Sequence, residues 1–170
     1  MMQAQPALSL SATPVFPIYL EIEVGGKSKE ELLAELQSNG FFVSNREKEI
    51  MGKPAWKLGK KETVKIARVQ VRDLGFTKFP TTAQIWARIR DLGHSLCEPQ
   101  DGPAIRLALK DQPRGDSFWL AMEQIVASDG GPYVFNVRRN DDGKPWLLAY
   151  WARSDSGWLL GQKVVFRLRK

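Results

Sequence analysis

The second half of this chain alternates short apolar runs with strong turn signals, and this alternation restricts the fold more than any other feature of the sequence. The turn signals, rich in Asp, Asn, Gly and Pro, stand at 111–115, 129–131 and 140–143. The strands predicted around them are 104–109, 117–123, 132–138, 146–151 and 163–169. Strands joined by short connections pair antiparallel. The pattern therefore predicts a mostly antiparallel sheet.

The first half combines a half-buried strand with two well-marked helices. Apolar and polar residues alternate over 17–24, which is the period of a strand. Residues 28–31 and 81–84 both have the spacing of a capping box, in which the first and fourth side chains exchange hydrogen bonds with the backbone. We therefore expect helices over 28–37 and 81–92, each followed by a glycine that stops it.

Shorter elements are expected between these two helices. Residues 41–43 have the composition of a short strand, and the capping pattern recurs at 44–47 before one or two helical turns that end at Gly52. Residues 55–58 and 63–71 are typical of the two strands of a hairpin.

Together these elements indicate an α+β fold with two main helices packed on a mostly antiparallel β-sheet. Residues 1–14, rich in Ala, Ser, Gln and Pro, are expected to form a loose leader, and residues 15–170 a single compact domain. One core should hold apolar side chains of the first strand, the last strand and both helices. These are Ile18, Leu20, Ile22, Phe166, Leu168, Leu32, Leu36, Ile85 and Ile89.

The charge balance favours anionic partners. The 25 Lys and Arg residues exceed the 19 Asp and Glu residues, which gives a net charge of +6. One interpretation is a nucleic-acid-binding module, because phosphate contacts require well-placed cations. The other is a solvated surface whose lysines protect the edge of the sheet. The cations concerned are the cluster Lys53, Lys57, Lys60, Lys61 and Lys65 and, at the C-terminus, Arg167, Arg169 and Lys170.

The single histidine and the single cysteine limit the available chemistry. With His94 and Cys97 alone, an intramolecular disulfide and a Cys/His zinc site are excluded, and we expect no metal or other cofactor. A Cys–His pair is the one nucleophilic arrangement that the composition permits, so an enzyme using these two residues is a further alternative. In the structural interpretation, His94 ends a helix and Cys97 is a small buried side chain.

No targeting or membrane segment is expected. The first twenty residues contain no Lys or Arg, and prolines interrupt their apolar residues, which is not the pattern of a secretory signal. No apolar run approaches the length that spans a membrane. We therefore expect a cytoplasmic protein without membrane partners.

Tryptophans dominate the last part of the chain. Trp146, Trp151 and Trp158 stand among chemically unrelated neighbours before the terminal strand. Buried tryptophans at these positions would fix the backbone as structural anchors. The side chains between them would then be free to form a binding surface.

Residues 65–170 resemble a family of small bacterial proteins of uncharacterised function. The resemblance depends on the segments 76–77, 82–85, 91–93, 96–99, 111–116 and 165–170. The C-terminal tail is also similar to the variable proteins of diversity-generating retroelements. In those proteins, error-prone copying of adenines scrambles asparagine codons near the end of the gene, usually on a C-type-lectin-like scaffold.

This resemblance implies a non-catalytic ligand-binding protein with a variable C-terminal surface. It also implies a C-type-lectin-like arrangement in which the first and last strands are adjacent. The partner would be a protein or another macromolecule. The residues implied in ligand binding lie between and beside the tryptophan anchors. They are Ala149, Tyr150, Arg153, Ser156, Gly157, Leu159, Leu160 and the bordering Gln162.

Overall fold

A computed structural model describes residues 14–57 and 59–169 of the chain. The strands are β1 (Leu20–Val24), β2 (Phe42–Val43), β3 (Glu62–Gln70), β4 (Ser117–Leu120), β5 (Ile125–Val126), β6 (Pro132–Arg139), β7 (Pro145–Trp151) and β8 (Lys163–Arg167). The helices are α1 (Lys29–Ser38), α2 (Asn45–Met51), α3 (Thr82–Asp91), α4 (Asp101–Ala108) and the 3-10 turn η1 (Val71–Leu74). The predicted leader lies outside the described residues, apart from Pro14.

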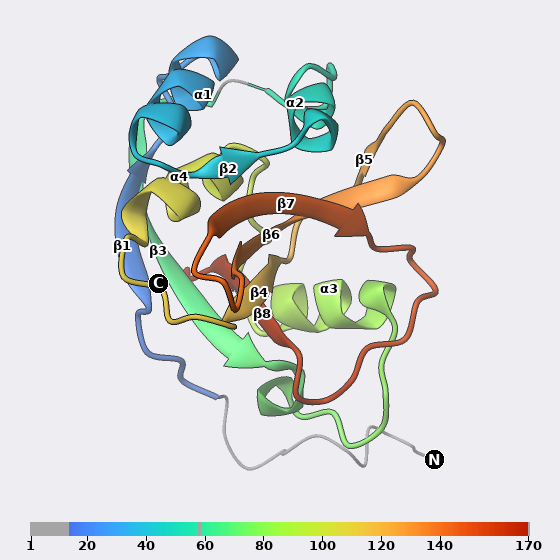
Figure 1. Ribbon diagram of the computed structural model, residues 1–170. Coiled ribbons are helices and arrows are strands. Elements are labelled where there is room, and N and C mark those ends of the chain that lie inside the picture. The colour runs from blue at the N-terminus through green and yellow to red at the C-terminus, as the bar shows by residue number, and fades with distance from the viewer. Residues whose placement is uncertain (1–13, 58, 170) are drawn as a thin grey trace, which may run out of the picture.

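The strands form one mixed sheet of eight strands (Figure 1). Its order is β1-β3-β8-β4-β6-β7-β2, and β5 pairs with β6 beside this path. The pairs β4–β8 and β2–β7 are parallel, and the other pairs are antiparallel. The α+β class and the predominance of antiparallel pairing are therefore confirmed.

The first and last strands are not adjacent, contrary to the arrangement that the resemblance implied. β3 lies between them, because its first half pairs with β1 and its second half with β8. A nine-residue strand is long enough to bond on both edges. The order of strands depends on such contacts between distant segments, which local patterns do not encode.

Two of the predicted strands are wrong. The run 104–109 lies mostly in α4, where Asp101 stands in the first turn and Pro103 follows closely, both of which favour a helix start. A short run of Ala, Leu and Ile fits a buried helix as well as a strand. The predicted hairpin of 55–58 with 63–71 is also absent, because no strand forms over the described residues 55–57. β3 pairs with β1 instead.

The capping boxes were reliable predictors. The hydroxyl of Ser28 accepts from the N–H of Glu31 at 3.1 Å, and the Glu31 carboxylate accepts from the N–H of Ser28 at 2.9 Å. Thr81 and Gln84 repeat this exchange at 3.2 and 2.9 Å. Both helices begin where the sequence predicts, because the interactions that start them are local.

Helices cover both faces of the sheet. α4 packs with Gly102 against the ring of Phe135, so closely that a Cβ at this glycine would come 2.6 Å from the ring. Trp119 pairs with Asn136, the neighbour of Phe135 on β6, and therefore points to the opposite face. There it meets Trp158, which also contacts Trp86 of α3. α3 thus covers the face opposite to α4.

The buried apolar side chains form one cluster that draws on both halves of the chain. Among the predicted core residues, Leu32, Leu36, Ile85, Ile89 and Phe166 are buried, while Leu20, Ile22 and Leu168 pack at the margin of the cluster. Ile18, by contrast, is 51% exposed. The alternation of inward and outward side chains shifts by one residue just before β1. Leu20 is the register partner of Ile66, but the N–H of Tyr19 also donates to the carbonyl of Ile66.

A fully buried arginine ties α4 to the sheet. Arg106 donates to the side-chain oxygen of Gln112 at 2.7 Å and to the carbonyls of Leu109, Arg138 and Trp146. Burial without a carboxylate in direct contact lowers the pKa of its guanidinium to about 10. Arg106 therefore remains charged at neutral pH, stabilised by carbonyl dipoles.

Candidate ligand-binding surface

The connection between β7 and β8 is fastened to the start of α3 by its backbone. The N–H groups of Thr82 and Ala83 donate to the carbonyls of Ser156 and Ser154, both at 3.0 Å, and the N–H of Trp158 donates to the carbonyl of Pro80 at 2.8 Å. The first N–H groups of a helix have no partner within it. The connection supplies these partners with backbone oxygens, so its path does not depend on its own side chains.

Trp158 is buried, as an anchor of this connection should be. It is 4% exposed, and its indole Nε1 donates to the hydroxyl of Thr82 at 2.8 Å. Its ring packs against Trp119 and Trp86, with ring centroids 4.9 and 5.9 Å away. The connection is therefore fixed at this end by packing as well as by hydrogen bonds.

Trp151 is not a buried anchor, contrary to the sequence-based expectation. It ends β7 and is 51% exposed. Its indole lies directly on the backbone of Gly131, where a Cβ would come 2.2 Å from Nε1. The ring of Tyr133 stands edge-on to it at 6.4 Å. The side chain of Trp151 is thus held in place by its neighbours, and about half of its surface is exposed.

Trp146 holds an intermediate position at the outer side of β7. Its ring lies 5.1 Å from that of Phe42 on β2, and its carbonyl accepts from Arg106 at 3.2 Å. Trp146 therefore anchors the short edge strand β2. It does not anchor the connection between β7 and β8, contrary to the expectation from the sequence.

The predicted contact residues divide into exposed and structural positions. Tyr150, Arg153, Gly157 and Leu159 are exposed, whereas Ser156, Leu160 and Gln162 are partly buried. The carbonyls of Leu160 and Gln162 accept from Arg72 and Val71, which fixes the end of the connection against η1.

Ala149 is the clearest correction within the predicted surface. It is 8% exposed, and its N–H donates to the carboxylate of Glu47 at 2.9 Å. Glu47 is a buried residue of α2 and also accepts from the hydroxyl of Ser44. Ala149 therefore belongs to the packing of α2 on β7 and offers no side chain to a ligand.

A hollow of about 620 Å³ joins the exposed part of the connection to the turn between β5 and β6. Trp151 and Val126, which is 60% exposed, provide its open apolar surface. Its remaining walls come from Gln124, Asp129, Gly130, Gly131, Pro132, Arg153, Ser154 and Asp155.

Charged groups of both signs border this hollow. Arg153 and Asp155 form an exposed ion pair at 3.3 Å. Hydrogen bonds from the hydroxyl of Tyr133 and the N–H of Gly131 lower the pKa of Asp129, so this carboxylate stays ionised at neutral pH. The sequence did not indicate Val126 or Asp129, because their nearness to Trp151 arises only when the β5–β6 turn folds against the end of β7.

His94 and Cys97 have separate hydrogen-bond partners. The Sγ of Cys97 lies 3.7 Å from the carbonyl of Val165, while Nδ1 of His94 accepts from the N–H of Arg169 at 3.1 Å. Both residues border a hollow of about 610 Å³, but Cys97 is buried, and burial raises the pKa of its thiol well above the usual value. Burial also lowers the pKa of His94. This arrangement provides no activated thiolate.

Three cations of the nucleic-acid interpretation have carboxylate partners within the protein. Arg167 forms a two-bond ion pair with the fully buried Asp101, at 2.7 and 2.8 Å, and is not available to a phosphate. Lys53 and Lys61 have carboxylate neighbours at 3.6 and 3.7 Å. Lys170 lies outside the described residues.

In residues 14–57 and 59–169, no group of three or more His, Cys, Asp and Glu side chains is placed to hold a metal ion. No helix of this part of the chain is both long and apolar enough to cross a membrane.

Comparisons with known protein families, with curated proteins and with solved structures give no match for this chain.

Proposed function

We propose that this protein is a non-catalytic binding protein that contacts a macromolecular ligand through the hollow around Trp151. The observation that carries the proposal is that the exposed ring of this tryptophan is held in one position. The side chain is half exposed, yet its position is fixed by Gly131 and Tyr133. A large, rigid aromatic surface that is already in place loses little conformational entropy on binding.

The surroundings of Trp151 fit a protein surface better than a small molecule. Val126 and Trp151 provide apolar contact, and Arg153, Asp155 and Asp129 provide charged groups at the rim. An apolar centre with a polar rim is the usual anatomy of a protein–protein contact. The hollow is shallow and open, which suits the convex side chains of a partner.

The backbone bonds of the connection also support a surface whose side chains vary. Ser154 and Ser156 cap α3 through their carbonyls, so other residues at these positions would preserve the same bonds. We propose on this basis that the connection is a tolerant display segment, as in the variable proteins that the tail resembles. A complete C-type-lectin-like arrangement is not needed for this role.

Site-specific crosslinking tests the proposal. A photoreactive phenylalanine analogue at position 153 is expected to crosslink a partner, and excess unmodified protein is expected to suppress the crosslink. The Trp151→Ser protein should suppress it at least tenfold less well, because the apolar centre of the contact is lost. The same analogue at position 114, which is exposed on a different loop, is the control. Equal crosslinking from both positions would contradict the proposal.

The gene tests the variable-surface component separately. A diversified segment requires a near-identical copy of the 3′ end, which differs only at adenines and lies beside a reverse-transcriptase gene. Without such a copy the display segment is not diversified, while the binding proposal for Trp151 stands on its own experiment.

A further inference from the structure

We propose a second binding site, in which the free edge of β1 and the adjoining groove take an extended peptide of alternating cationic and apolar residues. The site lies at the opposite end of the sheet order from β7 and does not depend on the function proposed for Trp151.

The backbone groups that β3 directs toward β1 can be assigned from its other neighbour. The N–H of Leu168, just after β8, donates to the carbonyl of Lys65 at 2.8 Å, so the backbone groups of Lys65 face β8. These groups alternate in direction along a strand. The backbone groups of Val64 and Ile66 therefore face β1.

The same alternation identifies the free groups of β1. Ile22 is the register partner of Val64, so its backbone groups face β3. The N–H and C=O groups of its neighbours Glu21 and Glu23 therefore point away from the sheet, and among the described residues no strand pairs with this edge. An extended chain that lies along β1 would find two donors and two acceptors at strand spacing, which is the requirement for adding a strand.

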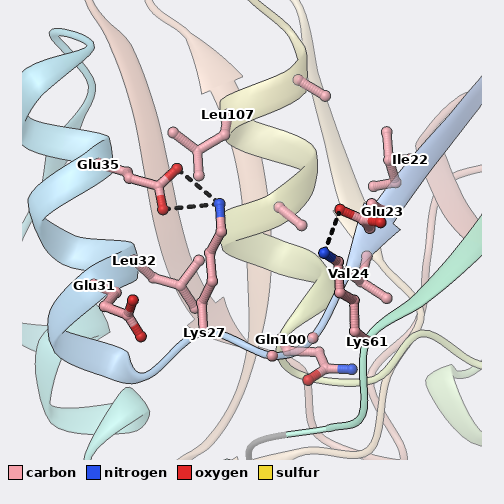
Figure 2. A pocket seen from close by; sticks show the side chains of 14 residues that line it. Ile22, Glu23, Val24, Lys27, Glu31, Leu32, Glu35, Lys61, Gln100 and Leu107 are labelled. Carbon is pink, nitrogen blue, oxygen red and sulfur yellow. Dashed lines mark hydrogen bonds and ion pairs between the residues drawn. The ribbon is translucent and has the colours of Figure 1, made fainter.

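A groove of about 530 Å³ runs beside this edge. Figure 2 shows its lining side chains on α1, α4 and β1, with α4 between the other two elements in this view. Its lining is mixed. Ile22, Val24, Leu32 and Leu107 contribute apolar groups, and Lys27 and Glu35, which form an ion pair at 2.8 Å, contribute charged ones together with Glu23, Glu31 and Lys61. Side chains that an added strand directs to this face would meet the apolar groups of Ile22 and Val24 next to the strand, with the Lys27–Glu35 ion pair beyond them.

The acidic side chains of β1 alternate with the apolar ones and start from the other face of the strand, although Glu23 also borders the groove. Glu21 and Glu23 are exposed and alternate with the half-buried Ile22. Residues directly opposite each other in paired strands direct their side chains to the same face. A peptide on this edge would therefore place one set of alternate residues beside the two carboxylates and the other set in the groove, so cationic residues must alternate with apolar ones.

Glu23 is expected to contribute more than Glu21 to this charge pairing. On the inner side, Lys65 stands opposite Glu21, whereas Thr63 stands opposite Glu23. Within the described part of the chain Glu23 forms an ion pair with Lys61 at 3.7 Å, and both side chains are mostly exposed. Such a pair contributes little, so a cation of the peptide can replace it.

A second copy of this chain is a poor occupant of the edge. Antiparallel pairing of β1 with itself would bring Glu21 and Glu23 of the two copies close together on one face, and like charges opposite each other disfavour pairing. A nucleic acid is disfavoured by the same two carboxylates. The chemistry of the edge selects a cationic partner.

Two labelled hexapeptides and the intact protein test the site. A fluorescein-labelled peptide of alternating Lys and Val should raise its anisotropy on titration with the protein, whereas one of alternating Glu and Val should not. In amide NMR spectra, the largest shifts should fall on Glu21 and Glu23. The variant Glu23→Lys should weaken binding about tenfold, since it replaces an attraction by a repulsion.

Two further variants separate the edge from the general charge of the protein. Glu123→Lys makes the same charge change at an exposed position on the loop after β4 and should leave the affinity unchanged. Glu23→Pro removes an outward N–H without removing a β1–β3 bond, and should weaken binding at least as much as Glu23→Lys. The proposal is overturned if the Lys–Val peptide does not bind, if both peptides bind equally, or if Glu123→Lys weakens binding as much as Glu23→Lys.

Discussion

Trp151 and Trp158 are the same residue type, seven positions apart, one at the end of β7 and the other within the connection to β8, and yet they have opposite roles. Trp158 is enclosed by two other tryptophans and has a partner for its indole N–H. Trp151 lies on a glycine at the end of a strand, with half of its surface open. The contrast shows that a tryptophan near this connection is buried or exposed according to whether α3 covers it, and the exposed one is the one proposed to contact a ligand.

The largest expected effect is that of removing Trp158. The variant Trp158→Ala should lower the free energy of unfolding by about 3–5 kcal/mol, because a large buried ring is lost and the cavity is only partly refilled. Urea denaturation followed by circular dichroism measures it. A loss below about 1 kcal/mol would show that Trp158 does not anchor the connection.

The hydrogen bond from Trp158 to Thr82 should account for a smaller part of that stability. Thr82→Val keeps the shape of the side chain but leaves the buried Nε1 without its acceptor, and should cost about 1–3 kcal/mol. Thr81→Val is a matched comparison, since it removes the capping hydroxyl at the neighbouring position and is expected to cost about 1 kcal/mol. If the Thr82→Val variant and the natural protein are equally stable in urea, this hydrogen bond does not contribute to the free energy of unfolding.

The position of the Trp151 ring should be sensitive to substitution of Gly131. In Gly131→Ala the new methyl group would collide with the indole, so the ring must leave its position, and stability should fall by about 1–3 kcal/mol as in other overpacked sites. Partner crosslinking should fall with it. Gly130→Ala is the comparison variant. Its positive φ of 82° adds backbone strain, but nothing lies within 4 Å of the added methyl group, so the indole is not displaced. If Gly131→Ala leaves crosslinking intact, the position of the ring is not what the ligand recognises.

Trp151→Ser should show the reverse of Trp158→Ala. Its stability should fall by only about 1 kcal/mol, since the ring is half exposed, while ligand contact is lost. Measuring unfolding and crosslinking on the same two variants sharpens the comparison. Equal losses of stability in both would mean that the two tryptophans are both structural.

The smallest effects are expected at the exposed side chains of the connection. Arg153→Ser and Leu159→Ser should each change the free energy of unfolding by about 0.5 kcal/mol or less, because both side chains are exposed and the backbone bonds remain. Thermal unfolding of both variants checks this. A large loss at either position would end the proposal of a tolerant display segment.

Several elements could be predicted because their causes lie within a few residues. The exchange of hydrogen bonds between Thr81 and Gln84 starts α3, and the turn at 140–143 joins β6 to β7 in the register that its length allows. These interactions need no distant partner. The apolar run that became α4 was ambiguous, because a short run of this kind satisfies either a helix or a strand until its neighbours are known.

The candidate sites depended much more on tertiary structure. The sequence alone determined the class of fold, the starts of α1 and α3 and the part of the chain rich in tryptophan, because hydrophobic period, capping and turn chemistry act locally. Only the tertiary structure placed β3 between β1 and β8, buried Trp158 but exposed Trp151, and brought Val126 beside it. Burial and strand order are set by contacts between segments far apart in the chain, and no local pattern carries that information.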